Sequence, residues 1–585
     1  IKGKSTGKEE NKKQEGGQRA GGTLRKCIRI QRNTELFSKQ ERNDETAYED
    51  CFGKEKTMKM RKLLAAGMAA AMVLGCVPAW NVSASGTSVE ADTETEGKKH
   101  VENLVIGTTS VNDTFNLTSQ SGAFGRINYN CIANAYFAYT DENNEIQPYF
   151  LTSYEISEDG TELAITFPTD KVWHDGTPVT AEDVQFTFEY YRDVVGNSYI
   201  KNLESIEVTG ENSMTLKFSS ADAYSYMANG ATSQSMLPKH IWENITEPED
   251  YVGEDAYIGC GPYKLTGYNV DAGTCTFEAV PENNYLGEIT VDSITVRSYS
   301  SQDALLMAMV NGEIDTMFDY AMPIDTTLLE LISGDENIDP GESDYSGNYQ
   351  VTFGMEEGHV FTDKAAREAV VKCLDWDLIT NIINGEYGEI PGSGVISPSC
   401  KGFDDTLWRF YQDTEEANQI LDDAGYEDTD GDGYRENPDG SQLDVKVTPQ
   451  YSSKDQELLN RLADVIMASM EEIGIRTHID EESLQSDEIW EANMVDGNYD
   501  MNIGYCTSGT AQYRSAFRYF VADVLEDDTE NTAGSTWIWG TDHDPELTEE
   551  VWALTYAASE EEYLEHISNL QKMASEDLFG FSLCW

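Results

Sequence analysis

Four aspartates in the second half of the chain have the spacing of a calcium-binding loop. Asp428, Asp430, Asp432 and Asp439 fall at positions 1, 3, 5 and 12 of such a loop, with Gly433 at position 6. Carboxylate oxygens at this spacing can surround a hard cation, so calcium is one candidate ligand. The same residues are also typical of turns between strands, and the segment that follows predicts a strand rather than a helix. The sequence indicates no other cofactor.

A histidine and an aspartate lie together ahead of a predicted helix. His174 and Asp175 precede a glycine and a proline, a combination typical of a tight turn. Thr180 and Asp183 then have the spacing of a capping box, which predicts that a helix begins there. We therefore interpret His174 and Asp175 as turn and scaffold residues rather than a catalytic pair.

Sequence patterns of hydrolytic enzymes give no convincing set. We find no Gly-x-Ser-x-Gly, His-Glu-x-x-His or Ser-x-x-Lys with the partners that catalysis requires. The chain is predicted not to be an enzyme, and an exported hydrolase is the main alternative class. Histidines are scattered along the sequence, at positions 100, 174, 240, 359, 478, 543 and 566.

The charge of the chain excludes several classes of partner. The 585 residues include 106 acidic and 40 basic residues, a net charge of −66. A surface of this sign repels nucleic acids and anionic lipid headgroups. We interpret the acidity as a means of solubility in an exposed setting.

The segment 58–84 has the features of an export signal peptide. A basic stretch from Met58 precedes an apolar run that ends at Cys76, and Val-Ser-Ala follows at 82–84. The run is short for a membrane span. Cleavage after Ala84 is one outcome. The other is lipidation of Cys76, because Val-Leu-Gly-Cys resembles a lipobox. Both outcomes predict export.

Residues 1–57 and 85–100 do not have the composition of a folded domain. The first segment is polar, rich in Lys and Arg, and begins with Ile. We expect it to be either a non-native extension upstream of a start at Met58 or Met60, or a disordered N-terminal extension. Residues 85–100 have the composition of a disordered linker.

The cysteines after residue 84 are scattered and include no Cys-x-x-Cys. This arrangement favours neither a disulfide framework nor a zinc site. Cys260 and Cys275 flank a predicted hairpin, but their offsets from its turn do not place them opposite each other. We expect free, buried thiols.

Strand and helix patterns alternate irregularly, which predicts an α/β fold with inserted subdomains. Expected strands cover 104–107, 214–218, 293–297 and 443–447, with a hairpin over 263–280. Expected helices begin at Thr180 and at Ser300 with Asp303, and also cover 363–383 and 455–473; glycines 312 and 474 end two of them.

Several ordered motifs together carry a family resemblance. His-Asp-Gly-Thr-Pro-Val-Thr-Ala-Glu-Asp-Val at 174–184 is followed by Leu-Pro-Lys-His-Ile-Trp at 237–242, Gly-Cys-Gly-Pro-Tyr-Lys at 259–264 and Asn-Gly-Glu-Ile-Asp at 311–315. From about residue 104 onward, the chain resembles the family 5 extracellular solute-binding proteins, the oligopeptide- and dipeptide-binding group of bacterial ABC importers.

The resemblance implies an α/β, two-lobed periplasmic-binding-protein type II clamp with an extra inserted subdomain. Residues 576–585 would begin an incomplete return to the first lobe, and we expect the chain to be a fragment that lacks a few dozen C-terminal residues. The implied boundaries are 101–135 plus 231–345 for lobe I, 136–230 for the inserted subdomain and 346–575 for lobe II.

The same resemblance implies a function in uptake. Such a protein captures oligopeptides or similar small solutes between its lobes and delivers them to an ABC permease. It would be a monomer at the cell surface or in the periplasm, in contact with the membrane only through a lipid anchor or the permease. A sensor module that signals without transport is a third interpretation.

In peptide-binding relatives, a glycine–aromatic segment followed by an aspartate captures the ligand's α-ammonium group. Here Gly504 and Tyr505 match that segment, but Ser508 stands where the aspartate would be. A hydroxyl lacks the charge that pairs with an ammonium, so a blocked peptide or an oligosaccharide becomes an alternative ligand. The ligand-binding residues implied are Tyr199, Tyr505, Cys506, Thr507 and Ser508.

Overall fold

The computed structural model describes much of the chain after residue 99. Residues 1–99, with the expected signal peptide and Cys76, lie outside the described residues, and all described residues belong to the compact unit Thr95–Trp585. None of the helices described there combines the length and apolar composition needed to cross a membrane. The description covers 100–585 apart from 110–115, 117–131, 142, 249–250, 252, 254, 270–271, 319–323, 333–334, 336, 340, 342–347, 356–357, 453–455, 507–516 and 518–544.

The first sheet combines one early strand with strands that follow much later in the chain. Its order is β11-β1-β10-β9-β8, in which β1 runs parallel to both neighbours and β9 antiparallel to β8 and β10. Helix α6 (Gln302–Val310) connects β10 to β11. The strands are β1 (Leu104–Thr108), β8 (Tyr263–Asn269), β9 (Thr274–Ala279), β10 (Ser293–Ser298) and β11 (Thr316–Met317).

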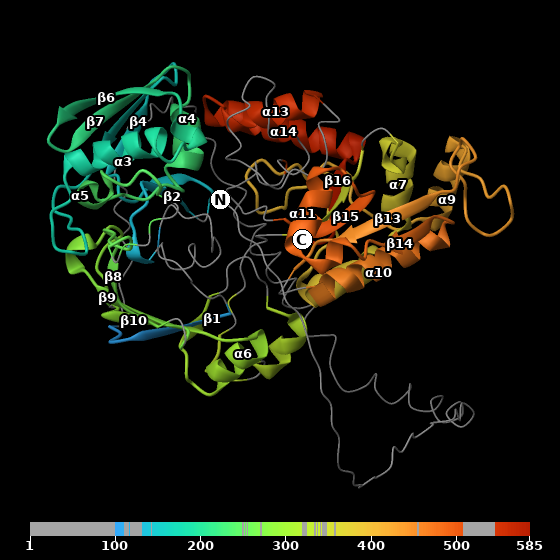
Figure 1. The fold of residues 1–585 in the computed structure, drawn as a ribbon, viewed down its shortest axis with the longest axis horizontal. Coiled ribbons are helices and arrows are strands. Elements are labelled where there is room, and N and C mark those ends of the chain that lie inside the picture. Colours follow the sequence, from blue (N-terminus) through green and yellow to red (C-terminus); the bar gives the residue numbers. More distant parts are fainter. Residues whose placement is uncertain are drawn as a thin grey trace, which may run out of the picture. The chain divides into compact units, whose positions relative to one another are not determined.

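Between β1 and β8 the chain forms a separate antiparallel sheet (Figure 1). This sheet has its own hydrophobic core. Its strands have the order β4-β5-β7-β6, and helix α3 (Ala181–Asp193) contributes Val184 and Phe188 to the core. The other elements are β2 (Ala138–Thr140), β3 (Ile146–Pro148), β4 (Ser153–Ile156), β5 (Glu162–Thr166), η1 (Ser198–Ile200), β6 (Leu203–Gly210), β7 (Ser213–Phe218), α4 (Ala223–Ser225), η2 (Tyr226–Gly230) and α5 (Lys239–Trp242).

The second large sheet is mixed and has the order β14-β13-β15-β12-β16. Strands β13, β14 and β15 are parallel, whereas β12 runs antiparallel to both of its neighbours. The elements are β12 (Asn348–Phe353), α7 (Lys364–Cys373), α8 (Trp376–Asn384), α9 (Thr414–Ala424), β13 (Asp444–Pro449), α10 (Gln456–Glu472), β14 (Arg476–Ile479), α11 (Asp487–Val495), β15 (Met501–Cys506), α13 (Pro545–Thr555), α14 (Glu560–Asp577) and β16 (Gly580–Ser582).

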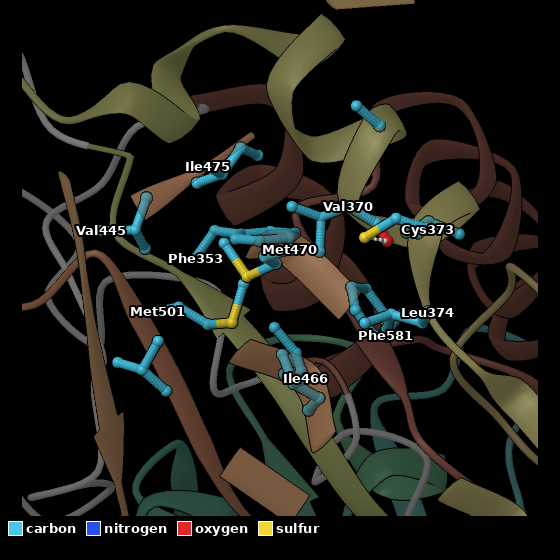
Figure 2. Packing of buried hydrophobic residues seen from close by; sticks show 14 of the residues in the cluster. Phe353, Val370, Cys373, Leu374, Val445, Ile466, Met470, Ile475, Met501 and Phe581 are labelled. Carbon is cyan, nitrogen blue, oxygen red and sulfur yellow. Dashed lines mark hydrogen bonds between the residues drawn. The ribbon is translucent and has the colours of Figure 1, made fainter. Parts of the chain in front are cut away.

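One face of this second sheet carries the largest hydrophobic core. Figure 2 shows Phe353 and Phe581 from the sheet near Val370 of α7 and Met470 of α10. The rings of Phe353 and Phe581 meet edge to face, with centroids 5.8 Å apart. Burial of these side chains fixes the sheet against its helices and thereby sets where each strand ends.

Helix starts agree with the capping residues in most places. The Asp183 carboxylate accepts hydrogen bonds from the backbone N–H and the hydroxyl of Thr180 at 2.8 and 2.7 Å, as the capping box predicts. Helix α6 is capped by Ser301 rather than Ser300, one residue later than predicted.

The single helix predicted for 363–383 is wrong, because the structure divides it into α7 and α8. Leu374 has extended backbone angles, and the Asp375 side chain accepts a hydrogen bond from the N–H of Leu378 at 3.0 Å. An aspartate that caps a new helix competes with continuation of the old one.

The end of the described chain joins the second sheet. We expected residues 576–585 to begin a return to lobe I. Instead β16 pairs antiparallel with β12, and the backbone N–H of Trp585 donates to the carbonyl of Glu389 at 2.9 Å. The apolar Phe581, which packs in the second sheet's core, gives the physical reason for this pairing.

The predicted hairpin over 263–280 is confirmed as β8 and β9, with Gly273 at φ +58° in its turn. The cysteines whose side chains the structure describes are free and buried, as predicted: Cys260, Cys275, Cys373, Cys400 and Cys584.

Candidate functional site

The carboxyl ends of the parallel strands β13 and β15 lie at the same end of the second sheet. We call this end of the sheet the carboxyl edge. Strands β13 and β15 run in the same direction, so Pro449 and Cys506 finish at one edge, and β12 begins there with Asn348 opposite Cys506. In open α/β sheets, ligands bind outside the carboxyl ends of the strands. Tyr505 precedes Cys506 at this end of β15.

The predicted ligand segment therefore runs through this edge. The backbones of Tyr505 and Cys506 are the last two residues of β15, which places them at the carboxyl end. Their side chains, and all of Thr507 and Ser508, lie outside the described residues. The ligand-binding roles of all four residues stay predictions.

A group of buried polar side chains lies on β12 and β15, two to four residues before the end of β15, and was not predicted. Gln350 and Thr352 of β12 and Asn502 of β15 are at most 1% exposed. Thr352 faces Asn502 across the ladder, and Gln350 faces Gly504. Asn502 Oδ1 accepts a hydrogen bond from Trp490 Nε1 at 3.2 Å.

Several atoms of this group have no hydrogen-bond partner. They are both amide atoms of Gln350, the hydroxyl of Thr352 and the amide nitrogen of Asn502. Buried polar groups are normally paired with protein or with ordered water. The group therefore consists of neutral donors and acceptors, without a formal charge, on two strands that lead to the candidate edge. The alternation of polar and apolar residues in β12 is typical of a strand with one exposed face, whereas the structure buries both faces.

Tyr199 lies on a different element, in the short helix η1 of the antiparallel subdomain. Its backbone N–H donates to the side chain of Asn197 at 3.0 Å. Its Cβ is 3.2 Å from where a Cβ on Gly230 would be, so Gly230 allows η1 and η2 to approach closely. Tyr199 is half-buried and packs against the subdomain's core. The described contacts hold it within its own subdomain.

The aspartate loop only partly fits a calcium site. Carboxylate oxygens of Asp428, Asp430 and Asp432 lie within 4.8 Å of one another, and all three residues are exposed. Asp428 accepts hydrogen bonds from the N–H groups of Gly431 and Gly433 at 2.7 and 3.0 Å, as in an ordinary turn.

Two of the predicted ligands have other partners. Asp432 pairs with Arg476 at 2.8 Å, and Asp439 accepts from the N–H and hydroxyl of Ser441 at 2.8 and 2.6 Å. Strand β13 follows, as the sequence predicted, rather than the second helix of a calcium-binding hand. These contacts favour the turn interpretation.

The predicted turn at His174 and Asp175 is confirmed. Asp175 accepts hydrogen bonds from the N–H and hydroxyl of Thr177 at 2.9 and 2.7 Å and pairs with His240 at 2.9 Å. His174 Nε2 donates to the carbonyl of Gly261 at 3.1 Å. Burial lowers the pKa of His174 to about 4, so the ring is neutral at pH 7. Its hydrogen bond joins the turn to the segment just before β8.

Known proteins are similar to this chain in sequence and in fold. The sequence profile described as "Bacterial extracellular solute-binding proteins, family 5 Middle" matches residues 145–524. The oligopeptide-binding protein AppA of Bacillus subtilis (strain 168) is 25% identical over 351 residues, 57% of this chain and 61% of AppA. The chain thus aligns with less than two thirds of this curated relative's length.

Two solved structures show the extent of the common fold. NikA from Brucella suis, in complex with Fe(III)-EDTA, has a TM-score of 0.67 at 16% identity and is covered over 93% of its length by 82% of this chain. The periplasmic oligopeptide-binding protein of Thermotoga maritima, with bound mannohexaose, has a TM-score of 0.63 at 19% identity, over 84% of this chain and 91% of that one.

These likenesses confirm the predicted fold class, the α/β two-lobed clamp of periplasmic binding proteins. The profile match extends over 145–524, which includes the antiparallel subdomain and the strands β12, β13 and β15 at the candidate edge. The chain belongs to the bacterial extracellular solute-binding proteins of family 5.

Proposed function

We propose that this protein is the exported substrate-binding component of an ABC importer. It captures an oligopeptide or a similar small solute between two lobes and delivers it unchanged to a membrane permease. Lobe I would comprise 101–135 and 231–345, and lobe II residues from 346 onward, with 136–230 as the inserted subdomain. The single observation that carries the proposal is the family match over 145–524.

The proposed mechanism is a shift between open and closed forms. A ligand that contacts both lobes only in the closed form stabilises that form by its extra contacts. A micromolar dissociation constant corresponds to about 8 kcal/mol of net binding free energy. This protein would need no chemical step, because binding and release are its whole task.

We propose that the ligand contacts the carboxyl edge of the second sheet. Tyr505, Cys506, Thr507 and Ser508 continue from the end of β15, and Tyr199 would add an aromatic surface from the subdomain. Stacking on tyrosine suits peptide side chains and sugar rings alike.

The neutral character of this edge favours a ligand without a free ammonium group at that end. Ser508 cannot pair with a charge as a carboxylate does, and the neighbouring buried groups of Gln350 and Asn502 are neutral amides. A peptide blocked at its N-terminus is our first candidate. An oligosaccharide is the second, which the mannohexaose bound to the Thermotoga maritima relative supports.

The test is a thermal-unfolding screen of the full chain with three probes: a pool of free nonapeptides, the same pool N-acetylated, and mannohexaose. A true ligand at 100 times its dissociation constant stabilises the folded state by about 2.7 kcal/mol. We expect the acetylated pool to raise the unfolding temperature. Mass spectrometry of the released ligand then separates the classes, because a binder returns it intact and a hydrolase returns it cleaved.

A pair of tyrosine variants locates the site. Tyr505→Ala should abolish the stabilisation by the bound probe, and Tyr387→Ala, which truncates a tyrosine exposed by 44%, should leave it intact. Equal loss in both variants, or no stabilisation by any of the three probes, would contradict the proposal.

A further inference from the structure

One lysine joins two parts of the chain that are distant in sequence. Lys401 Nζ forms an ion pair with Glu145 of the inserted subdomain at 2.8 Å, and a second with Glu560 at the start of α14. Beside it, Asn144 Nδ2 donates a hydrogen bond to the carbonyl of Ser399 at 3.0 Å. The subdomain thereby contacts segments that follow β12.

Further contacts continue this junction along α4 and α13. The Ser225 hydroxyl donates to the carbonyl of Thr555 at 2.6 Å and is buried. Lys201 Nζ lies 5.3 Å from the ring centroid of Tyr556, a cation–π geometry. The rings of Tyr224 and Tyr563 meet at 6.1 Å. We call this set of contacts the Lys401 seam; its members are residues 144, 145, 201, 224, 225, 399, 401, 555, 556, 560 and 563.

The seam is polar and incompletely filled. A small, partly open pocket lies in it, lined from both sides by residues that include Thr140, Ile146, Ala228 and Leu564. Asn144 Oδ1 is buried without a hydrogen-bond partner. Surfaces that remain together permanently are usually close-packed and apolar, whereas surfaces that separate are more polar.

The hydrophobic cores on the two sides are separate. One core lies between residues 135 and 260 and includes the subdomain, and the other lies around α13 and α14. Among the described residues of the subdomain, Tyr224 packs against the latter core. Little apolar surface would therefore be exposed if the seam opened, which keeps the free-energy difference between the joined and parted forms small.

We propose that the Lys401 seam is a latch that closes the subdomain onto the second lobe without any ligand and parts when the clamp opens. This inference rests on the proposed function, because it needs two lobes that move. The latch sets how much of the ligand-free protein is closed, and hence how much of the ligand's binding free energy is needed for closure. Lys201, two residues after Tyr199, links the latch to the predicted ligand surface.

The experiment measures the distance across the seam in the ligand-free full chain. Spin labels on Glu211→Cys and Glu549→Cys, both exposed positions, report the separation of the subdomain from α13 by pulsed electron resonance. The chain without these two changes, labelled in the same way, corrects for the native cysteines. Across the seam, Lys401→Glu replaces the attraction to Glu145 with a repulsion, and Lys401→Met removes that attraction alone.

We expect a longer-distance population to grow in both variants, about two- to fivefold in Lys401→Met, as the loss of one partly exposed ion pair across the seam predicts. Raising the salt concentration to about 1 M should have the same effect in the native chain, because screening then acts within about 3 Å. A double variant, Lys401→Glu with Glu145→Lys, restores the ion pair across the seam and should recover part of the short distance.

The chain supplies a matched control. Lys217 also bridges two glutamates, Glu162 at 3.5 Å and Glu207 at 3.0 Å, but all three lie in one sheet. Lys217→Glu should leave the distance unchanged. An unchanged distance in both Lys401 variants, or an equal change in Lys217→Glu, would overturn the latch. Because no ligand is used, failure of the ligand screen and failure of the latch are separate results.

Discussion

Gln350 is a side chain whose replacement should stabilise the protein. Its amide is 0% exposed, and neither its nitrogen nor its oxygen has a hydrogen-bond partner. A buried amide without partners costs about 1–3 kcal/mol relative to a paired or solvated one. Methionine has a similar length and no amide. We therefore expect Gln350→Met to raise the free energy of unfolding of the second sheet by about 1–2 kcal/mol.

Gln571 provides the comparison, because it is also 0% exposed but is fully paired. Its nitrogen donates to the carbonyls of Gly402 and Ile567 at 2.8 and 3.3 Å, and its oxygen accepts from the N–H of Asp404 at 3.0 Å. Gln571→Met leaves buried groups without partners, so we expect a loss of about 2–3 kcal/mol.

The assay is hydrogen exchange of the ligand-free full chain, read by mass spectrometry on peptides from β12 and β15. Exchange gives the free energy of opening of one sheet, which global unfolding of a protein with several cores does not. Destabilisation of these strands by Gln350→Met would refute the reasoning. It would mean that the amide has a partner, such as ordered water, and that the polar group beside the edge is satisfied.

Four other measurements test separate parts of the account. Ser508→Asp should restore the charge that pairs with an α-ammonium, so calorimetry should show a gain in affinity for free over N-acetylated nonapeptides; equal affinities would contradict the proposed role. The pKa of His174 is lowered to about 4 from 6.5 by burial, so the unfolded chain binds a proton that the folded chain does not. Stability should then fall as the pH drops from 6.5 towards 4, and His174→Gln should flatten that part of a urea-unfolding profile; an unaltered slope would contradict this. Burial raises the pKa of the Cys260 and Cys275 thiols to about 12 and about 11, so neither should react with a thiol reagent until the chain is unfolded, and early modification would argue against the described packing. Calcium and EGTA should leave the unfolding temperature unchanged, because Arg476 already pairs with Asp432, whereas a shift that Asp428→Asn removes would revive the calcium loop.

Local rules predicted those elements whose stabilising contacts are close in sequence. The capping box of Thr180 and Asp183 and the hairpin turn at Gly273 were recoverable because each involves groups a few residues apart. The break between α7 and α8 at Leu374 could not be predicted in this way. The apolar stripe continues through it, and only the Asp375 cap shows that a second helix begins.

The candidate site was predictable only as far as one strand. The family motif located Tyr505 and Cys506, and the sheet then placed them at the carboxyl end of β15. The burial of Gln350 was not predictable, because a polar–apolar alternation indicates an exposed face. The Lys401 seam could not be predicted from the sequence either, because Lys401 lies 256 residues from Glu145 and 159 residues from Glu560.

The position of β1 in the first sheet has a consequence for how the chain acquires its structure during synthesis. Both neighbours of β1 belong to residues 293–317, so the first strand to be made waits for almost two hundred residues before it can pair. The antiparallel sheet of the subdomain, whose strands pair within 153–218, is synthesised before that point. Distant pairings form slowly and leave strand edges open in the meantime. The early strand is thus the part of the nascent chain most exposed to mispairing, and the rapid local folding of the inserted segment shortens the distance that it has to search.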